Sequence, residues 1–286
     1  MAVTADFQLS FGGVDMGDGT DYDVVDIDGL GVPGVRSSDV ETLRRHGLHP
    51  GDDFVGGRVV TVTLEVDGGA DAATLTSRMA TLAAALRPGQ DESALVFQLP
   101  GVAGGGRRRL LVRPRRVAVP VNLQRVYGLP EVVAQFAATD PRIYDDTQST
   151  DSTSLPTSGT GLTWPLTWPL NWGAVGTSGS IFATNAGNFE APVTIRLDGP
   201  VTNPRIENVT VGRTIELDIT LNAGEYLEID TQARTVLLGG TASRYSSLTT
   251  TSQWWDLAPG TNEVRFRAST PTAATMTLTW RSAWLA

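Results

Sequence analysis

The chain has 286 residues, a formal net charge of −9 and no cysteine, and all 22 of its basic residues are arginines. This composition excludes disulfides, thiolate chemistry and any site that needs a lysine, such as a Schiff base or a phosphate-binding P-loop, and the acidic balance argues against general nucleic-acid binding. No apolar run approaches the roughly 18 residues of a membrane span, and the first residues lack the plan of a signal peptide.

The first half of the chain, residues 1–145, predicts a mainly β domain that carries one helix. Arg58–Val66 alternates apolar and polar residues, which is the period of a half-buried strand. Asp71 is a helix N-cap residue, and the apolar residues that follow at helical spacing, up to a Pro-Gly pair, predict a helix over residues 71–87. We expect further strands at 94–99, 110–119 and 132–138, and Pro114 makes the second of these an edge strand or the site of a β-bulge.

The second half predicts an antiparallel β-sandwich over residues 162–286, joined to the first half by a linker over residues 146–161. The linker is rich in Ser, Thr and Gly, a composition typical of flexible connections. After it, short alternating segments recur about every 10–12 residues with turn signals between them, which is the spacing of sandwich strands. Thr214–Leu221 is the clearest example, because every second residue is Ile or Leu.

A tryptophan-rich segment opens this second half: residues 163–172 read TWPLTWPLNW. A helix is excluded because Pro165 and Pro169 would each cost about 3 kcal/mol in a helix interior. With a period of two, the Trp and Leu residues share one face of a strand, and both prolines block the same edge. We predict an edge strand in which Trp164, Trp168 and Trp172 cover the sandwich core. The alternative is an exposed aromatic platform for sugar.

Charge is divided between two blocks of the first half. Residues 1–71 contain 14 acids and 4 arginines, whereas residues 107–125 contain seven arginines and no acid. Arg113 and Arg115 share a strand face, and Arg116 points the other way. No aromatic residue is interleaved with these arginines to stack bases, so pairing with carboxylates is favoured over nucleic-acid binding. We hypothesise that the two blocks meet across a subunit boundary. The residues that this hypothesis names are Asp15, Asp18, Asp21, Asp23, Arg113 and Arg115.

The sequence contains no constellation that predicts catalysis, a bound metal or a cofactor. His46 and His49 are the only histidines, which is too few for a structural zinc site in a chain without cysteine. The acidic residues 15–28 do not have the spacing of an EF-hand calcium loop, and GGGRRR at 104–109 lacks the GK[ST] ending of a P-loop. We expect solvated histidines, an acidic loop or subunit contact, and a hairpin tip at these places.

Several stretches, in a fixed order, resemble one known family over nearly the whole length of the chain. DFQLSFGGVDMGDGT, VDIDGLGVPGVRSSD and HPGDDFVGGRVVTVTLEV resemble the N-terminal part of tail proteins from siphophages of actinobacteria, and AQFAATDPRIYDD closes that part. GPVTNPRIENVTVG, LNAGEYLEIDTQARTVLLGG, WDLAPGTNEVRFRA and TLTWRSAW resemble the C-terminal domain of distal tail proteins. The chain therefore resembles the distal and minor tail proteins of these phages.

This resemblance implies a structural protein of the tail tip, with no catalytic residues and no cofactor. It implies a homo-hexameric ring that connects the tail tube to the baseplate or host-recognition apparatus, with a tail-tube-like N-terminal domain and a galectin-like C-terminal sandwich. The implied partners are the tail tube protein, a tail hub or tail-associated protein and the tape measure protein, with DNA only passing through the ring lumen and no membrane. The expected location is the virion, after synthesis in the host cytoplasm.

Two other classes of function remain open. The main alternative is a minor tail or adhesin protein whose sandwich binds a host cell-wall saccharide. Trp254 and Trp255 are a candidate platform for it, although adjacent residues of a strand face opposite ways, so at most one of them is exposed. The third class is a wall glycosidase. With 31 acids some pair of carboxylates always lies at a suitable distance, so such a pair is no evidence for this class.

Overall fold

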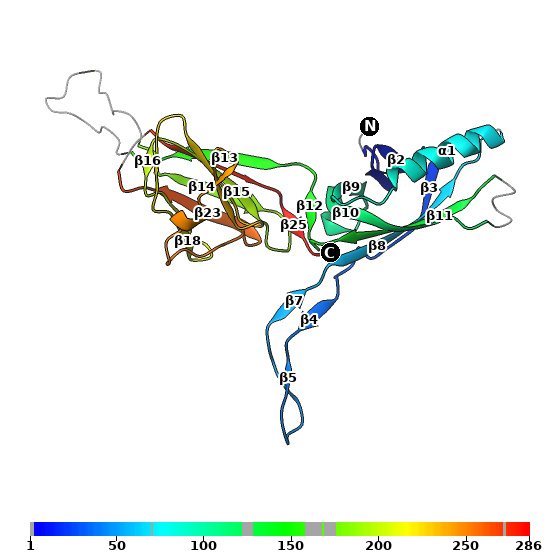
Figure 1. Ribbon diagram of the computed structural model, residues 1–286, viewed down its shortest axis with the longest axis horizontal. Helices are drawn as coiled ribbons and strands as arrows, with labels where there is room; N and C mark the ends of the chain where they lie inside the picture. Colours follow the sequence, from blue (N-terminus) through cyan, green and yellow to red (C-terminus); the bar gives the residue numbers. More distant parts are fainter. Residues whose placement is uncertain (1–2, 70, 122–127, 158–167, 169–175, 271–272) are drawn as a thin grey trace. The chain divides into compact units, whose positions relative to one another are not determined.

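The computed structural model describes residues 3–69, 71–121, 128–157, 168, 176–270 and 273–286 (Figure 1). The chain divides into two compact units: unit 1 combines Met1–Asp146 with Trp284–Ala286, and unit 2 is Thr147–Ala283. Both units are built from antiparallel strands, and the α-helix found in the described residues lies in unit 1. The predicted fold class, mainly β with a helix in the first half, is confirmed. No helix in this part of the chain is long and apolar enough to cross a membrane.

A nine-stranded antiparallel sheet is the framework of unit 1. Its strand order is β2-β1-β9-β10-β11-β8-β3, while β12 pairs with β10, and β25, which carries Trp284, pairs with β12. The strands are β1 (Gln8–Phe11), β2 (Val14–Gly17), β3 (Tyr22–Asp28), β8 (Arg58–Val66), β9 (Ser93–Gln98), β10 (Arg107–Ala118), β11 (Glu131–Ala138), β12 (Ile143–Asp145) and β25 (Ala283–Trp284), and the turn η1 (Ala103–Gly105) precedes β10.

The long strand β10 changes partners halfway along its length. Its residues 107–112 pair with β9, and its residues 113–118 pair with β11. The register shifts between Pro114 and Arg116, so the bulge predicted at this proline is present. Among the described residues, this half of β10 is also an edge of the sheet, because residues 113–118 pair only with β11. Arg107–Arg109, predicted to lie in a hairpin tip, belong to this strand instead.

Helix α1 spans Ala72–Ala85 and begins where the sequence predicts. The Asp71 side chain caps it by accepting a hydrogen bond from the Thr74 amide at 2.7 Å. Leu82 and Leu86 are buried, and Leu75 packs against the same core.

Residues 35–55 form an arm that extends away from β8 (Figure 1). Two short hairpins build it: β4 (Val35–Ser37) pairs with β7 (Asp53–Val55), and β5 (Val40–Glu41) pairs with β6 (Leu48–His49). His46 and His49 are exposed on this arm, as the sequence predicts.

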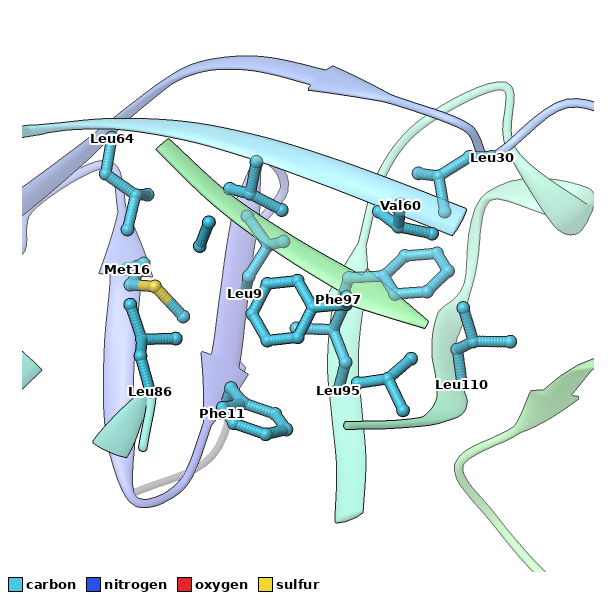
Figure 2. Packing of buried hydrophobic residues seen from close by; sticks show 14 of the residues in the cluster. Leu9, Phe11, Met16, Leu30, Val60, Leu64, Leu86, Leu95, Phe97 and Leu110 are labelled. Atoms are coloured by element: carbon cyan, nitrogen blue, oxygen red, sulfur yellow. The ribbon is translucent and has the colours of Figure 1, made fainter. Parts of the chain in front are cut away.

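The core of unit 1 lies between the inward faces of its strands and the end of α1. Figure 2 shows the side chains of β1, β2, β8, β9 and β10 pointing toward one another, with Leu86 closing one side. Phe11 and Phe136 meet edge to face with their ring centroids 5.0 Å apart. Because alternate residues supply this core, the outward residues of the same strands are free for other contacts.

The end of the chain packs into unit 1, where two buried arginines contact it. Trp284 is 7% exposed, and the guanidinium carbon of Arg108 lies 3.8 Å from the centroid of its ring. Arg58 is 2% exposed and donates a hydrogen bond to the Leu285 carbonyl at 2.5 Å. Burial lowers the pKa of both guanidinium groups. The sequence predicts a sandwich that extends to residue 286, but Trp284–Ala286 belong to unit 1, because Trp284 and Leu285 contact residues far away in the sequence.

Unit 2 contains two main antiparallel sheets, ordered β13-β24-β15-β20-β21-β22 and β14-β23-β17-β18, with a small β16-β19 pair. Each main sheet alternates buried and outward residues, the pattern of an antiparallel sandwich. The strands are β13 (Ser149–Ser154), β14 (Ser180–Asn185), β15 (Val193–Asp198), β16 (Val201–Thr202), β17 (Arg205–Asn208), β18 (Arg213–Glu216), β19 (Thr220–Leu221), β20 (Tyr226–Asp230), β21 (Thr235–Leu238), β22 (Ala242–Ser243), β23 (Gly260–Arg267) and β24 (Thr275–Trp280), and the turn η2 (Tyr245–Ser247) follows β22.

Two predictions for the start of the second half need correction. Ser149–Ser154, inside the predicted linker 146–161, is strand β13, because its backbone pairs with β24 whatever its side chains are. Trp168 is 87% exposed in a bend and covers no core, since Ile, Leu and Val residues of the two sheets already fill it. Trp164 and Trp172 lie outside the described residues.

Candidate subunit-contact surface

Four strands of unit 1 form a continuous antiparallel run with two unpaired edges. The run is β3-β8-β11 followed by residues 113–118 of β10. In the described residues, β3 pairs only with β8, and residues 113–118 of β10 pair only with β11. Unpaired edges offer a row of N–H and C=O groups to another strand.

The outward side of this run carries aligned rows of residues, and we call it the charged face. Its opposite side is the core, where Val60, Val62 and Leu64 of β8 are fully buried. On the outward side Val59 is 53% exposed. The rows across the strands are Asp23-Glu65-Glu131, Asp26-Thr63-Val133-Ala118, Asp28-Thr61-Gln135-Arg116 and Val59-Ala137-Arg113.

The edge of the charged face along β3 is acidic. Asp23, Asp26 and Asp28 are exposed there, and none of them makes an ion pair with another described residue. Asp28 accepts one hydrogen bond, from the adjacent Gly29 amide at 2.7 Å. Three carboxylates on one strand edge repel a second acidic edge and attract a basic one.

The edge along β10 is basic, and the bulge decides which arginines lie on it. The register shift adds one residue to β10, so Arg113 and Arg116 share the charged face. Arg115 is the extra residue at the bulge and is exposed. The prediction that Arg113 and Arg115 share a face with Arg116 opposite assumed regular alternation and is therefore wrong. Arg113 is half-buried, and its Nη1 donates to the Gln90 carbonyl at 3.5 Å.

Three of the four acids named from the sequence lie elsewhere. Asp15 and Asp21 line a cavity of about 660 Å³ beside α1, and Asp18 is exposed in the turn after β2. Asp21 pairs with Arg78 at 2.5 Å, and Arg78 also pairs with Asp67 at 2.8 Å. Of the four, only Asp23 lies on the charged face.

No ion pair within the described part of the chain joins the acids of residues 15–28 to the arginines of residues 107–116. Arg107 and Arg109 pair with Asp146, and Arg108 pairs with Asp145 at 3.4 Å. The side chains of Arg115 and Arg116 make no ion pair or hydrogen bond with any described residue. Within the part of the chain that the structure describes, the two charged edges are therefore not neutralised.

Within the described residues, no group of three or more His, Cys, Asp or Glu side chains is placed to hold a metal ion. Burial and the adjacent Asp140 raise the pKa of Tyr144, whose hydroxyl donates to Asp140 at 2.5 Å. Asp140 lies in the bend before β12 and Tyr144 lies in β12, so this bond restrains the bend.

Comparison with known proteins gives a family match for part of the chain and a fold likeness over nearly all of it. Residues 186–284 match the family described as siphovirus-type tail component, C-terminal domain. A search of curated protein sequences found no match. The fold is similar to the crystal structure of Dit (gp 19.1) of phage SPP1, described as a paradigm of the hub adsorption apparatus in phages that infect Gram-positive bacteria. That likeness has a TM-score of 0.66 and 16% identity and covers 96% of this chain and 98% of that one.

Two structures of the activated phage P2 baseplate are also similar. The one with Ca matches with a TM-score of 0.50 and 11% identity over 91% of each chain. The one with Sr matches with the same TM-score and identity over 95% of this chain and 96% of that one. At these identities the structures show a shared fold. Together with the family match, they confirm the resemblance to siphophage distal tail proteins and support a structural component of a phage tail.

Proposed function

We propose that this protein is a distal tail protein that forms a hexameric ring between the tail tube of a siphophage and its baseplate or host-recognition apparatus. One observation carries the proposal. A siphovirus-type tail component domain at residues 186–284 occurs in a chain whose fold, over 96% of its length, is similar to that of a hub protein. The role is structural and assigns the chain no catalytic residue and no cofactor.

The charged face supports a ring with head-to-tail contacts. The strands β10, β11, β8 and β3 alternate in direction, so β3 of one copy is antiparallel to β10 of a neighbour related by rotation. Pairing these two edges and repeating the contact closes a ring of continuous sheet. A two-fold dimer through β3 would instead bring two acidic edges together.

Opposite charges favour the same contact. Asp23, Asp26 and Asp28 of one copy would face Arg115 and Arg116 of the next. An exposed ion pair contributes only about 0–1 kcal/mol, so the effect depends on several pairs in each contact and on their repetition around the ring. Salt screens such pairs, and assembly should weaken as ionic strength rises.

The proposed position in the tail defines the partners. The ring would contact the tail tube protein on one side and a tail hub or tail-associated protein on the other, with the tape measure protein and DNA passing through its lumen. The proposed location is the tail tip of the virion.

Native mass spectrometry and negative-stain microscopy, with and without tube protein, test the ring. We expect six-fold rings at low ionic strength. Monomers or two-fold dimers under every one of these conditions would contradict the proposal.

Charge reversal tests the contact. Arg115→Glu combined with Arg116→Glu should reduce assembly most at low ionic strength, where screening is weakest. The matched control is Arg87→Glu, an exposed arginine of the same unit outside the charged face. Equal assembly of both variants across the salt range would leave the arginine edge without the proposed role.

A carbohydrate-binding minor tail or adhesin protein is the second candidate. Trp254 is half-buried and stacks on Tyr245, with the ring centroids 6.4 Å apart, while Trp255 is 2% exposed. At most one of the two adjacent tryptophans is therefore available to a ligand, as their alternation predicts. The exposed ring of Tyr245 is the observation that favours this second candidate, because a sugar can pack on an accessible aromatic face.

A further inference from the structure

A polar groove of about 370 Å³ crosses the outward face of the four-stranded sheet of unit 2. It lies over β17 and β18 and is bounded on one side by residues 249–253. No side chain lining it is apolar. The lining residues are Arg205, Gly212, Thr214, Glu216, Thr251 and Gln253.

Backbone hydrogen bonds fix the walls of the groove. The Gln253 amide donates to the Thr214 carbonyl at 2.8 Å, and the Thr249 amide donates to the Glu216 carbonyl at 3.0 Å. The Ser252 hydroxyl donates to the same carbonyl at 2.7 Å. The backbone from which the lining side chains project is therefore held in one geometry, which reduces the backbone entropy lost when a ligand binds.

The charged groups of the groove do not neutralise one another. Arg205 stands directly opposite Glu216 in the pairing of β17 with β18, where opposite charges usually pair. Nevertheless, the Arg205 side chain makes no ion pair or hydrogen bond with any residue that the structure describes, and the Glu216 carboxylate accepts only the Thr251 hydroxyl, at 3.4 Å. On its other side Arg205 faces Arg267, a like charge.

Arg267 is occupied by its own contacts, because its Nη1 donates to the carbonyls of Ser178, Gly179 and Phe266. Its Nη1 is therefore not available to the groove. A like-charge neighbour and an opposite-charge neighbour that does not pair leave the Arg205 side chain without a hydrogen-bond partner among the described residues. Opposite charges that stand side by side without pairing give up stability, and such exceptions concentrate at functional sites.

We infer that this groove is a binding site for a neutral saccharide. A sugar diol accepts hydrogen bonds from the Arg205 guanidinium and donates to the Glu216 carboxylate, so it satisfies both charges at once. Gln253 adds a donor and an acceptor from its amide. The opposite charges of Arg205 and Glu216 balance, so a charged ligand gains no net attraction, and an all-polar lining offers nothing to an apolar peptide side chain.

An aromatic pair adjoins one wall. Arg213, between two lining residues, donates from Nη1 to the Trp254 carbonyl at 3.3 Å. Trp254 stacks on Tyr245, which is 52% exposed. An aromatic ring offers the apolar face on which the C–H side of a sugar packs, and the polar groove offers the partners for its hydroxyl groups.

Isothermal titration calorimetry on the full chain tests the site, with neutral oligomers of galactose, glucose and N-acetylglucosamine as probes and polygalacturonate as the acidic comparison. We expect saturable binding of at least one neutral oligomer. Arg205→Ala and Glu216→Gln should each weaken it about tenfold or more, the effect of losing a hydrogen bond to a charged group. Arg234→Ala, which removes an exposed arginine of the same unit outside the groove, should leave it unchanged.

The inference is overturned if no neutral oligomer binds, if polygalacturonate alone binds, or if Arg205→Ala binds as well as the parent protein. Equal losses in Arg205→Ala and Arg234→Ala would also overturn it. Melting temperatures of the variants identify any loss that comes from unfolding. Ring assembly is measured separately, so failure of this site and failure of the proposed ring are distinguishable.

Discussion

Replacing Trp284 with alanine should strongly destabilise unit 1. The indole is 7% exposed, and truncating a buried tryptophan commonly costs about 3–5 kcal/mol because a cavity remains. Arg108 also loses the aromatic face that lies 3.8 Å from its guanidinium carbon, a contact of up to about 2 kcal/mol when desolvated. Arg108 keeps its hydrogen bond to the Ala103 carbonyl at 2.7 Å and its ion pair with Asp145, so only part of this second contribution is lost. We expect the free energy of unfolding to fall by about 4 kcal/mol.

Differential scanning calorimetry on the full chain measures this effect. In a domain of about 150 residues, 1 kcal/mol shifts the melting temperature by about 2–4 °C, so the transition of unit 1 should move down by about 10 °C. Trp168→Ala is the matched control, because that side chain is 87% exposed and its loss should change stability by less than about 0.5 kcal/mol. Trp284→Phe keeps an aromatic face under Arg108 and should recover part of the loss.

The reasoning fails if Trp284→Ala melts within about 2 °C of the parent protein, a shift that corresponds to less than about 1 kcal/mol. It also fails if Trp168→Ala is the more damaging of the two substitutions. Either result would show that the chain end does not contribute to the stability of unit 1 in solution.

Three further predictions concern the same unit. Arg58→Met removes the donor to the carbonyls of Gly29, Gly31, Pro141 and Leu285, and leaving them unsatisfied should lower the urea midpoint by an amount equivalent to about 3 kcal/mol; an unchanged midpoint would contradict it. Gly29→Ala should be poorly folded by circular dichroism, because Gly29 has φ +93° and a Cβ there would lie 2.0 Å from the Val59 carbonyl oxygen, whereas Gly31→Ala meets nothing within 4 Å and should fold normally. The hydrogen bond from the Thr74 amide lowers the pKa of Asp71 from 3.8. Its stabilising effect is therefore complete above the unfolded pKa and lost as pH falls through the lower folded value, so in urea titrations at acid pH Asp71→Asn should lose less stability than the parent protein.

Local chemistry determined much of unit 1 from the sequence. The alternation in Arg58–Val66 predicts β8, and the Asp71 cap with its spaced apolar residues predicts α1 within a residue or two. Pro114 marks the bulge in β10, because proline has no amide to donate to a regular ladder. These features depend on neighbours only a few residues away along the chain.

Tertiary structure alone decided the features that depend on distant partners. Ser149–Ser154 has the composition of a linker, yet its backbone pairs with β24, and no side-chain pattern records that pairing. The bulge moved Arg116 onto the face of Arg113, and cross-strand register placed Arg116 in the row that ends at Asp28 of β3. Trp168 alternates like a core residue and is exposed, whereas Trp284, three residues from the chain end, is buried under Arg108. Alternation predicts which side chains share a face of a strand. Only the three-dimensional packing determines whether that face contacts the core, the solvent or another strand.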